Sequence, residues 1–281
     1  MRIGITGATG QLGQLVVQKL KEKKVNADFV ALVRNPEKAK SLGIEARQFD
    51  YDQPENLSKA LIGIDRLLLI SGNEIGKRAE QHANVIDAAK EAGVKWIIYT
   101  SLLHADQSSI SLATEHLATE QKLHESGIPF TLLRNGWYTE NYTGNLKLSV
   151  EAGGLIGSAG NGKISSASRE DYAEAAAVVI SDDSHKGKTY ELAGDQSFTL
   201  NDLAEEVSKV TGKQISYTNL SESEYTEELK KMGLPEELAK VYAGFDVSAS
   251  KNDLFDDKMD LSKIIGRPTT PLFKNVDAAL A

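Results

Sequence analysis

Residues 6–13 read TGATGQLG and place three glycines, Gly7, Gly10 and Gly13, at intervals of three residues. A short apolar run precedes this stretch, and a helical pattern beginning at Leu12 follows it. A strand, a glycine-rich turn and a helix in this order form the phosphate cradle of dinucleotide-binding proteins. Gly7 would permit the tight turn, Gly10 the close approach of a pyrophosphate, and Gly13 the packing of the helix on the strand. The positive end of the helix would attract the phosphates.

The stretch therefore predicts a bound dinucleotide, and a glycine-rich turn without a ligand is the alternative. Its spacing is GxxGxxG instead of GxGxxG, so the prediction depends on the strand, loop and helix that surround it. The residues expected to hold the cofactor here are consecutive: Gly7, Ala8, Thr9, Gly10, Gln11, Leu12 and Gly13.

The first half of the chain alternates apolar strand-like runs with amphipathic helical patterns. Nearly continuous apolar strands separated by helices predict a parallel sheet covered on both faces, and right-handed crossovers make it doubly wound. We therefore expect an α/β, Rossmann-like fold. The predicted strands are residues 3–6, 29–33, 44–49, 66–70, 96–100 and 130–133.

The pattern changes near residue 135, after which glycine, asparagine, serine and aromatic residues predict loops. Further on, residues 199–211 predict a helix capped by Thr199, and residues 221–245 predict one or two more. We therefore expect a dinucleotide-binding Rossmann domain over residues 1–135, to which later segments can return. A smaller α/β lobe over residues 136–281 would bind the substrate. The glycine clusters at 153–154 and 160–162 are candidate hinges.

Composition narrows the function. The chain has 281 residues and a net charge of −8, which argues against wholesale binding of nucleic acid. It has no cysteine, which excludes disulfides and thiolate chemistry, and its five histidines lack an HExxH spacing, so we expect no metal site. The N-terminal MRIGITG predicts a strand instead of a leader, and no apolar run approaches the roughly 20 residues that span a bilayer. We expect a cytoplasmic homodimer without membrane insertion.

The end of the second predicted strand distinguishes between dinucleotides. An NAD site usually has a carboxylate there, which accepts hydrogen bonds from the ribose 2′-hydroxyl. This chain has Arg34, whose planar guanidinium matches the oxygens of a 2′-phosphate. Arg34 therefore predicts NADPH in preference to NADH, and a surface arginine without a ligand is the alternative.

Several longer stretches carry a family resemblance. VRNPEKA at 33–39, LLLIS at 67–71, YTSLLHAD at 99–106 and SGIPFTLLRNGWYTENY at 126–142 resemble the NmrA-like branch of the atypical short-chain dehydrogenase/reductases. Within that branch, nearly the whole chain is similar to the bacterial type 2 NAD(P)H:quinone oxidoreductases. The resemblance implies a Rossmann-like fold, NADPH as cofactor and a small-molecule quinone as substrate.

The chain departs from typical short-chain dehydrogenases at the catalytic tyrosine. None of its nine tyrosines has a lysine four residues later, which argues against alcohol dehydrogenase and sugar-epimerase mechanisms. Hydride transfer itself needs only the nicotinamide C4 held close to an acceptor. A quinone is electrophilic enough to accept hydride, so the missing tyrosine is compatible with quinone reduction.

His116 is the candidate catalytic residue, as proton donor to the quinol oxygen. It lies eleven residues before Gly127, where the resemblance implies the catalytic lysine of benzylic-ether and isoflavone reductases. A surface histidine is the alternative, and His104 is a weaker candidate for the same role. We expect the other histidines to be solvated: His82, His124 and His185.

Polar residues at the ends of strands four to six lie at the sheet edge where ligands of open α/β sheets bind. By resemblance, further cofactor-binding residues follow these strands: Ser71, Gly72, Asn73, Ser101, Asn135, Gly136, Trp137, Tyr138, Thr139, Glu140 and, later, Arg169. A salt bridge from Arg169 to Glu170 or Asp171 is the alternative role for that residue.

Flat aromatic faces in the same segment suit a planar quinone. Aromatic packing between the lobes is the alternative for each of them. The expected substrate-binding residues are Trp137, Tyr138, Asn141 and Tyr142.

These observations favour NADPH-dependent reduction of quinones to quinols by direct two-electron hydride transfer, without flavin. Two alternatives remain open. One is a non-catalytic NmrA-like NADP(H) sensor that binds a protein partner, because the missing tyrosine also suits that class. The other is a reductase of another electrophilic carbonyl or alkene.

Overall fold

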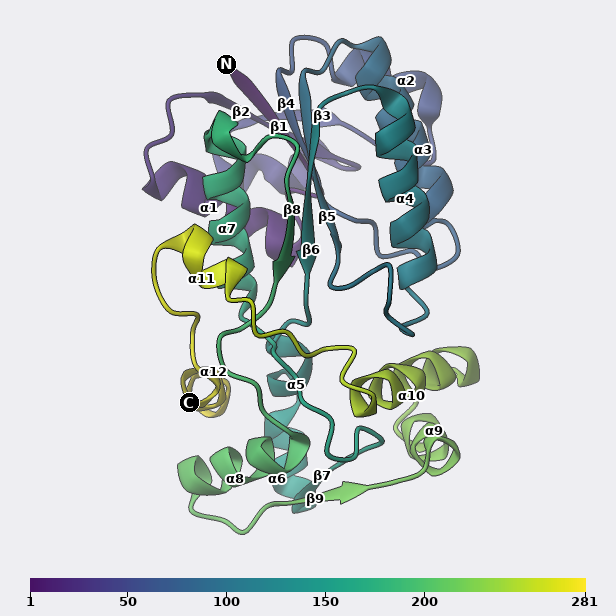
Figure 1. Ribbon diagram of the computed structural model, residues 1–281, viewed down its shortest axis with the longest axis vertical. Coiled ribbons are helices and arrows are strands. Elements are labelled where there is room, and N and C mark those ends of the chain that lie inside the picture. Colours follow the sequence, from purple (N-terminus) through teal and green to yellow (C-terminus); the bar gives the residue numbers. More distant parts are fainter.

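The computed structural model describes residues 1–281 and has an upper lobe built on a parallel sheet and a smaller lower lobe (Figure 1). The sheet order is β3-β2-β1-β4-β5-β6-β8, and every neighbouring pair is parallel. Strands β2 and β3 follow one another outward on one side of β1, and the later strands follow one another outward on the other side. At this change in the direction of winding, a crevice forms outside the carboxyl ends of β1 and β4. The strands are β1 (Arg2–Thr6), β2 (Asp28–Val33), β3 (Glu45–Gln48), β4 (Arg66–Leu69), β5 (Trp96–Leu102), β6 (Phe130–Asn135) and β8 (Thr189–Leu192).

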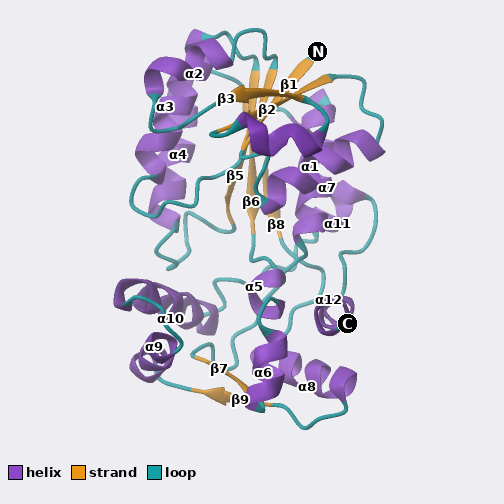
Figure 2. Ribbon diagram, turned by 180° about the vertical axis from the view of Figure 1, so that it is seen from behind, coloured by secondary structure: helices purple, strands orange, loops and turns teal.

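Helices cover both faces of this sheet, as seen from opposite sides in Figures 1 and 2. One face carries α1 (Gln11–Glu22), α7 (Arg169–Ser181) and α11 (Asp260–Ile265). The other carries α2 (Pro54–Ala60), α3 (Arg78–Glu91) and α4 (Ala113–Ser126). Separate apolar cores lie beneath the two helical layers. The predicted Rossmann-like fold is confirmed.

The second half of the chain contributes three elements to this upper lobe: α7, β8 and α11. The alanine-rich face of α7 packs against α1, and β8 forms the edge of the sheet beside β6. The sequence prediction named six strands and omitted β8, because that strand is short and mostly half-exposed. A single division at residue 135 therefore does not describe which residues pack together.

The lower lobe has an apolar core around Phe198, Val207 and Phe245, which continues to Leu102 and Ala113 of the upper lobe. The predicted helix at 199–211 is confirmed as α8, with a capping box between Thr199 and Asp202. Strand β7 pairs in parallel with β9. The elements are α5 (Glu140–Thr143), α6 (Leu146–Ala152), β7 (Gly154–Gly157), α8 (Leu200–Thr211), β9 (Ser216–Asn219), α9 (Glu222–Lys231), α10 (Glu236–Ser250) and α12 (Leu272–Leu280), with short 3₁₀ turns at Pro36–Leu42 and Asp183–His185 elsewhere.

The segments that cross between the lobes are bonded to one another. Gly136 N–H donates to Leu192 O at 2.7 Å, and Gly194 N–H donates to Ser165 O at 2.8 Å. Ser165 N–H donates in turn to the Leu254 carbonyl at 2.8 Å. The crossings therefore form a connected layer beneath the sheet edge.

Gly154 and Gly162, two of the glycines expected as hinges, lie in packed backbone. Gly154 begins β7 inside the lower lobe. A Cβ on Gly162 would lie 2.0 Å from the Ala249 carbonyl oxygen, so this glycine allows a close approach of two backbones. Gly153 and Gly160 have positive φ and open space around them, so the hinge expectation stays a prediction there.

Asp246 of α10 is an acidic group inside the lower lobe. Its Oδ2 accepts a hydrogen bond from Ser158 N–H at 2.8 Å, and a Cβ on Gly157 would lie 2.5 Å from the same oxygen. Burial raises the pKa of Asp246 to about 6, although the hydrogen bond opposes this shift. Folding therefore disfavours the charged form of this carboxyl.

We expect Asp246→Asn to stabilise the protein at neutral pH, because an amide removes the buried charge and still accepts from Ser158. In the parent, the stabilisation from protonated Asp246 is fully present below the unfolded pKa and is lost as pH rises through about 6. The difference in unfolding free energy between the variant and the parent should therefore grow from near zero at about pH 4 to about 1–3 kcal/mol at about pH 7.5. Urea unfolding at both pH values measures it. The exposed Asp257→Asn is the control, and a gap equal at both pH values would contradict the assignment.

Candidate active site

The loop between β1 and α1 has the geometry of a phosphate cradle. Gly7 has a φ of +58°, and its N–H donates to Leu32 O of β2 at 3.2 Å. Gly10 N–H donates to Gly7 O at 2.8 Å. A Cβ on Gly13 would lie 2.3 Å from the Gly7 carbonyl oxygen, so only glycine lets the helix approach this closely.

Five other backbone N–H groups at this loop have no acceptor within the protein. Gly10 is the N-cap of α1 and supplies no side-chain cap. The unpartnered N–H groups belong to Ala8, Thr9, Gln11, Leu12 and Gly13. Free N–H groups at the positive end of a twelve-residue helix fit a pyrophosphate.

Arg34 lies directly after β2, beside this loop. Its side chain is 70% exposed, and its nearest acidic partner is Glu74, with Nη1 and Oε1 3.5 Å apart. Exposed ion pairs of this kind contribute little stability. The guanidinium is therefore held weakly and keeps its planar donors available for another anion.

The predicted cofactor segment Ser71–Asn73 follows β4, next to the glycine loop. Its backbone is tied to neighbouring elements, because Ser71 N–H donates to Thr100 Oγ1 at 2.9 Å. Gly72 N–H donates to His82 Nε2 at 2.9 Å, and the Gly72 carbonyl accepts from Arg78 Nε at 2.8 Å. The segment thus has a fixed position at the crevice.

Two histidines differ from their sequence predictions. His82 was expected to be solvated, but it is fully buried, and desolvation together with the charge of Arg78 lowers its pKa to about 3. The expectation is wrong because the neighbouring residues of α3 are polar while the burial comes from distant parts of the chain. His116 is 5% exposed, so the surface alternative for it is also wrong.

His116 is bonded to the hydroxyl of Tyr99, 2.7 Å from its Nδ1. Tyr99 is fully buried, and the donor in this bond depends on the tautomer of His116. Desolvation, then the charges of Arg78 and His82, hold the pKa of His116 well below 6.5. Burial therefore favours the neutral imidazole, and the catalytic role of His116 stays a prediction.

Ser101, predicted to bind the cofactor, has its hydroxyl in an ion-pair network. Ser101 Oγ donates to Glu120 of α4 at 2.5 Å, and Glu120 pairs with Arg134 at 2.7 Å. Arg134 also contacts Asp106 at 2.7 Å and Glu191 at 3.0 Å. Ser101 and Arg134 are register partners on β5 and β6, so both side chains face α4. The Ser101 hydroxyl is thereby committed within the protein.

Arg169 brings several of the predicted cofactor residues together. Its guanidinium lies 4.5 Å from the centre of the Tyr138 ring and donates to Asn141 Oδ1 at 3.0 Å. Glu140 contacts the guanidinium at 3.4 Å and accepts from the Arg169 N–H at 2.9 Å. These groups form one polar cluster at the start of α7.

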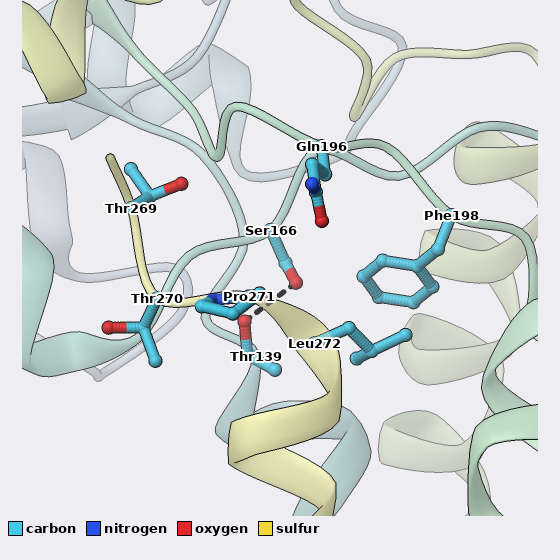
Figure 3. Close-up of a pocket in the computed structure, with 8 residues that line it drawn as sticks. All are labelled: Thr139, Ser166, Gln196, Phe198, Thr269, Thr270, Pro271 and Leu272. Carbon is cyan, nitrogen blue, oxygen red and sulfur yellow. Dashed lines mark hydrogen bonds between the residues drawn. The ribbon is translucent and has the colours of Figure 1, made fainter.

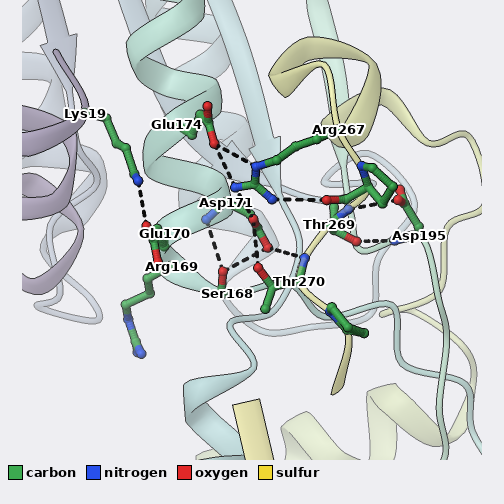
Figure 4. A network of polar contacts seen from close by, with 12 residues as sticks. Lys19, Ser168, Arg169, Glu170, Asp171, Glu174, Asp195, Arg267, Thr269 and Thr270 are labelled. Atoms are coloured by element: carbon green, nitrogen blue, oxygen red, sulfur yellow. Dashed lines mark hydrogen bonds and ion pairs between the residues drawn. The ribbon is translucent and has the colours of Figure 1, made fainter. Parts of the chain in front are cut away.

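The alternative partners of Arg169 are wrong. Glu170 pairs with Lys19 of α1 at 2.6 Å, and Asp171 pairs with Arg267 at 2.8 Å (Figure 4). Asp171 is fully buried and also accepts from Thr270 N–H at 2.9 Å. This pairing attaches the crossing segment 266–271 to the start of α7.

The predicted quinone-binding aromatics pack partly into the lower lobe. The Trp137 ring lies 5.2 Å from Phe245, and the Tyr142 ring lies 5.8 Å from Phe198. Tyr138 packs edge-on against Tyr172 at 5.4 Å. The three predicted rings are half-buried, so each keeps part of its surface open.

Thr139 and Asn135 lie deeper than their neighbours. The Thr139 hydroxyl is bonded to Ser166 at 2.8 Å, beside a cavity of about 10 Å³ that is large enough for a single water (Figure 3). The Thr139 hydroxyl thus joins two crossing segments. Asn135 is also nearly buried, and its Oδ1 has no hydrogen-bond partner.

Comparisons with known proteins identify the family of the chain and several of its relatives. Residues 1–277 match the model of the NmrA-like family. The chain belongs to the NmrA-like family. It is 56% identical to quinone oxidoreductase 2 of Escherichia coli strain K12, over 98% of this chain and 97% of that protein.

Two solved structures resemble the whole molecule. The NADPH-dependent quinone oxidoreductase QOR2 of Escherichia coli, complexed with NADPH, matches with a TM-score of 0.97 at 55% identity and covers 99% of this chain and all of that one. The Citrobacter sp. triphenylmethane reductase complexed with NADP(H) matches with a TM-score of 0.95 at 42% identity, covering 99% of each chain. No helix of the protein is both long and apolar enough to cross a membrane.

Proposed function

We propose that this protein reduces quinones to quinols with NADPH, by direct two-electron hydride transfer and without flavin. The whole-length likeness to a quinone oxidoreductase solved with NADPH carries the proposal. The glycine loop with its unpartnered N–H groups independently supports the binding of NADPH. The non-catalytic sensor is not favoured, because these whole-length relatives are oxidoreductases. A cytoplasmic homodimer remains the expected setting.

Different groups of residues would bind different parts of NADPH. The N–H groups of the glycine loop would bind the pyrophosphate, and Arg34 would bind the 2′-phosphate. Ser71–Asn73 and Asn135–Glu140 would enclose the nicotinamide side, with Arg169 orienting Tyr138 and Asn141. Bound NADPH supplies the hydride, and one solvent proton completes the quinol. The open parts of Trp137, Tyr138 and Tyr142 would contact the quinone ring.

His116 would act as a neutral hydrogen-bond donor. Its Nδ1 is bonded to Tyr99, and in the tautomer with the proton on Nε2 that N–H would be available to a quinone oxygen. A neutral imidazole N–H can stabilise negative charge that develops on a carbonyl oxygen. His116 would thus polarise the quinone oxygen while the solvent supplies the proton.

The direct test mixes purified protein, NADPH and a benzoquinone and follows the loss of reduced-nicotinamide absorbance. We expect saturable oxidation well above the uncatalysed rate without added flavin. Triphenylmethane dyes are a second class of acceptor for the same assay, because the Citrobacter reductase resembles the chain over its whole length. Background rates with several quinones and dyes would contradict the proposal.

Arg34→Asp should reverse or erase the preference for NADPH. We expect KM for NADPH to rise about 10–100-fold, the effect of losing a charge-assisted contact worth about 1.5–3 kcal/mol, with KM for NADH unchanged or lower. Lys213→Asp makes the same charge change on an exposed lysine of the lower lobe and should alter neither constant. Unchanged constants for Arg34→Asp would refute the 2′-phosphate contact.

His116→Leu should lower kcat for quinone reduction about 10–100-fold, whereas His116→Gln, which keeps an N–H donor, should lower it less. Because the pKa of His116 lies well below 6.5, it stays neutral at higher pH, and the parent kcat should be flat from about pH 6.5 to 8. A histidine titration within that range, abolished in His116→Leu, would instead identify His116 as a proton donor.

A further inference from the structure

We infer that His82 and Arg78 of α3 are positioning residues that fix the Gly72 amide at the edge of the cofactor crevice. The inference rests on the proposed function, in which Ser71–Asn73 lines the cofactor. His82 accepts from the N–H of Gly72, and Arg78 donates to its carbonyl. One glycine is thus held on both sides by side chains of the following helix.

The hydrogen bonds around His82 determine which nitrogen carries its proton. Thr119 Oγ1 donates to the Glu115 carbonyl at 3.0 Å, so its hydroxyl hydrogen is already used. His82 Nδ1, 2.9 Å from the same oxygen, must therefore donate to it. The lone pair of Nε2 is then free to accept from Gly72 N–H at 2.9 Å.

Only a neutral His82 can make this contact. An imidazolium would direct an Nε2–H at the Gly72 N–H and lose the hydrogen bond. The ring lies between Tyr51 and Tyr99, with ring centres 6.1 and 5.4 Å away, and no carboxylate is bonded to it. Its surroundings therefore favour the neutral form that the bond to Gly72 requires.

Arg78 is held by an acidic partner on α4. Its Nη1 lies 3.1 Å from Glu115 Oε2, and the other oxygen of Glu115 accepts from the backbone N–H groups of Gly76 and Arg78 at 3.0 and 3.1 Å. Glu115 thus caps the start of α3 while it orients the guanidinium. Arg78 is nearly buried, which strengthens its hydrogen bond to Gly72.

Gly72 has little freedom beyond these contacts. A Cβ there would lie 3.1 Å from Gln81 Oε1, and Ser71 N–H is already bound to Thr100. The peptide groups around Gly72 are thus already hydrogen-bonded within the protein before the cofactor arrives. Such preorganisation increases affinity by reducing the ordering cost of binding.

The test compares His82→Gln with His82→Phe. Glutamine can accept from Gly72 through Oε1 and donate to Thr119, whereas phenylalanine preserves the ring packing but leaves the Gly72 N–H unsatisfied. We expect Kd for NADPH, from fluorescence titration, to rise about tenfold in His82→Phe and to stay within about twofold of the parent in His82→Gln. His124→Phe, on the exposed face of α4, should bind NADPH like the parent.

Equal Kd values for all three variants, or a glutamine variant as weak as the phenylalanine variant, would overturn the inference. Nitrogen NMR of the parent tests it without any substitution: His82 should be neutral with its proton on Nδ1 at about pH 6–8. An Nε2–H tautomer or an imidazolium would overturn it. Both readouts concern binding and structure, so a failure of quinone turnover alone would refute the proposed function and leave this inference standing.

Discussion

The parallel pairing of β1 with both β2 and β4 is the constraint on which the rest of the molecule depends. The direction of winding reverses at β1, so no crossover helix covers the carboxyl ends of β1 and β4. The glycine loop and the Ser71–Asn73 segment meet there. Thr6 of β1 links them directly, because its hydroxyl oxygen accepts from Ile70 N–H at 2.9 Å.

The layer of crossing segments holds the lower lobe against this edge. Asp171 and Arg267 attach the last crossing to α7, and Asp195 exchanges hydrogen bonds with Thr269 in the same layer (Figure 4). A buried pair such as Asp171 and Arg267 is costly to break, because the remaining charge stays desolvated. The segment that contains Trp137 and Tyr138 is therefore part of this connected layer of crossing segments.

Local chemistry explains what could be predicted from the sequence. The glycine loop, the six predicted strands and the N-cap at Thr199 all follow from neighbouring residues, and each occurs, although β5 and β6 extend two residues beyond their predicted ends. Strand β8 did not, because a short, half-exposed edge strand carries little hydrophobic signal.

The side chains of the site depend on partners that are remote in sequence. Ser101 is committed to Glu120, and His82 faces Gly72, Tyr51 and Tyr99. The sequence marked His116 by its position in the family pattern, yet its neutral state follows from burial beside Arg78. None of these environments has a periodic pattern that a single sequence displays.

The central claim is that hydride passes directly from NADPH to the quinone. It is tested by a single turnover in which the protein–NADPH complex, shown to be free of flavin, is mixed rapidly with benzoquinone. NADPH deuterated on one or the other face of C4 supplies the comparison. The account predicts that one deuterated form slows nicotinamide oxidation several-fold while the other does not. An oxidation rate equal to the uncatalysed rate, or insensitive to deuterium on both faces, would contradict it.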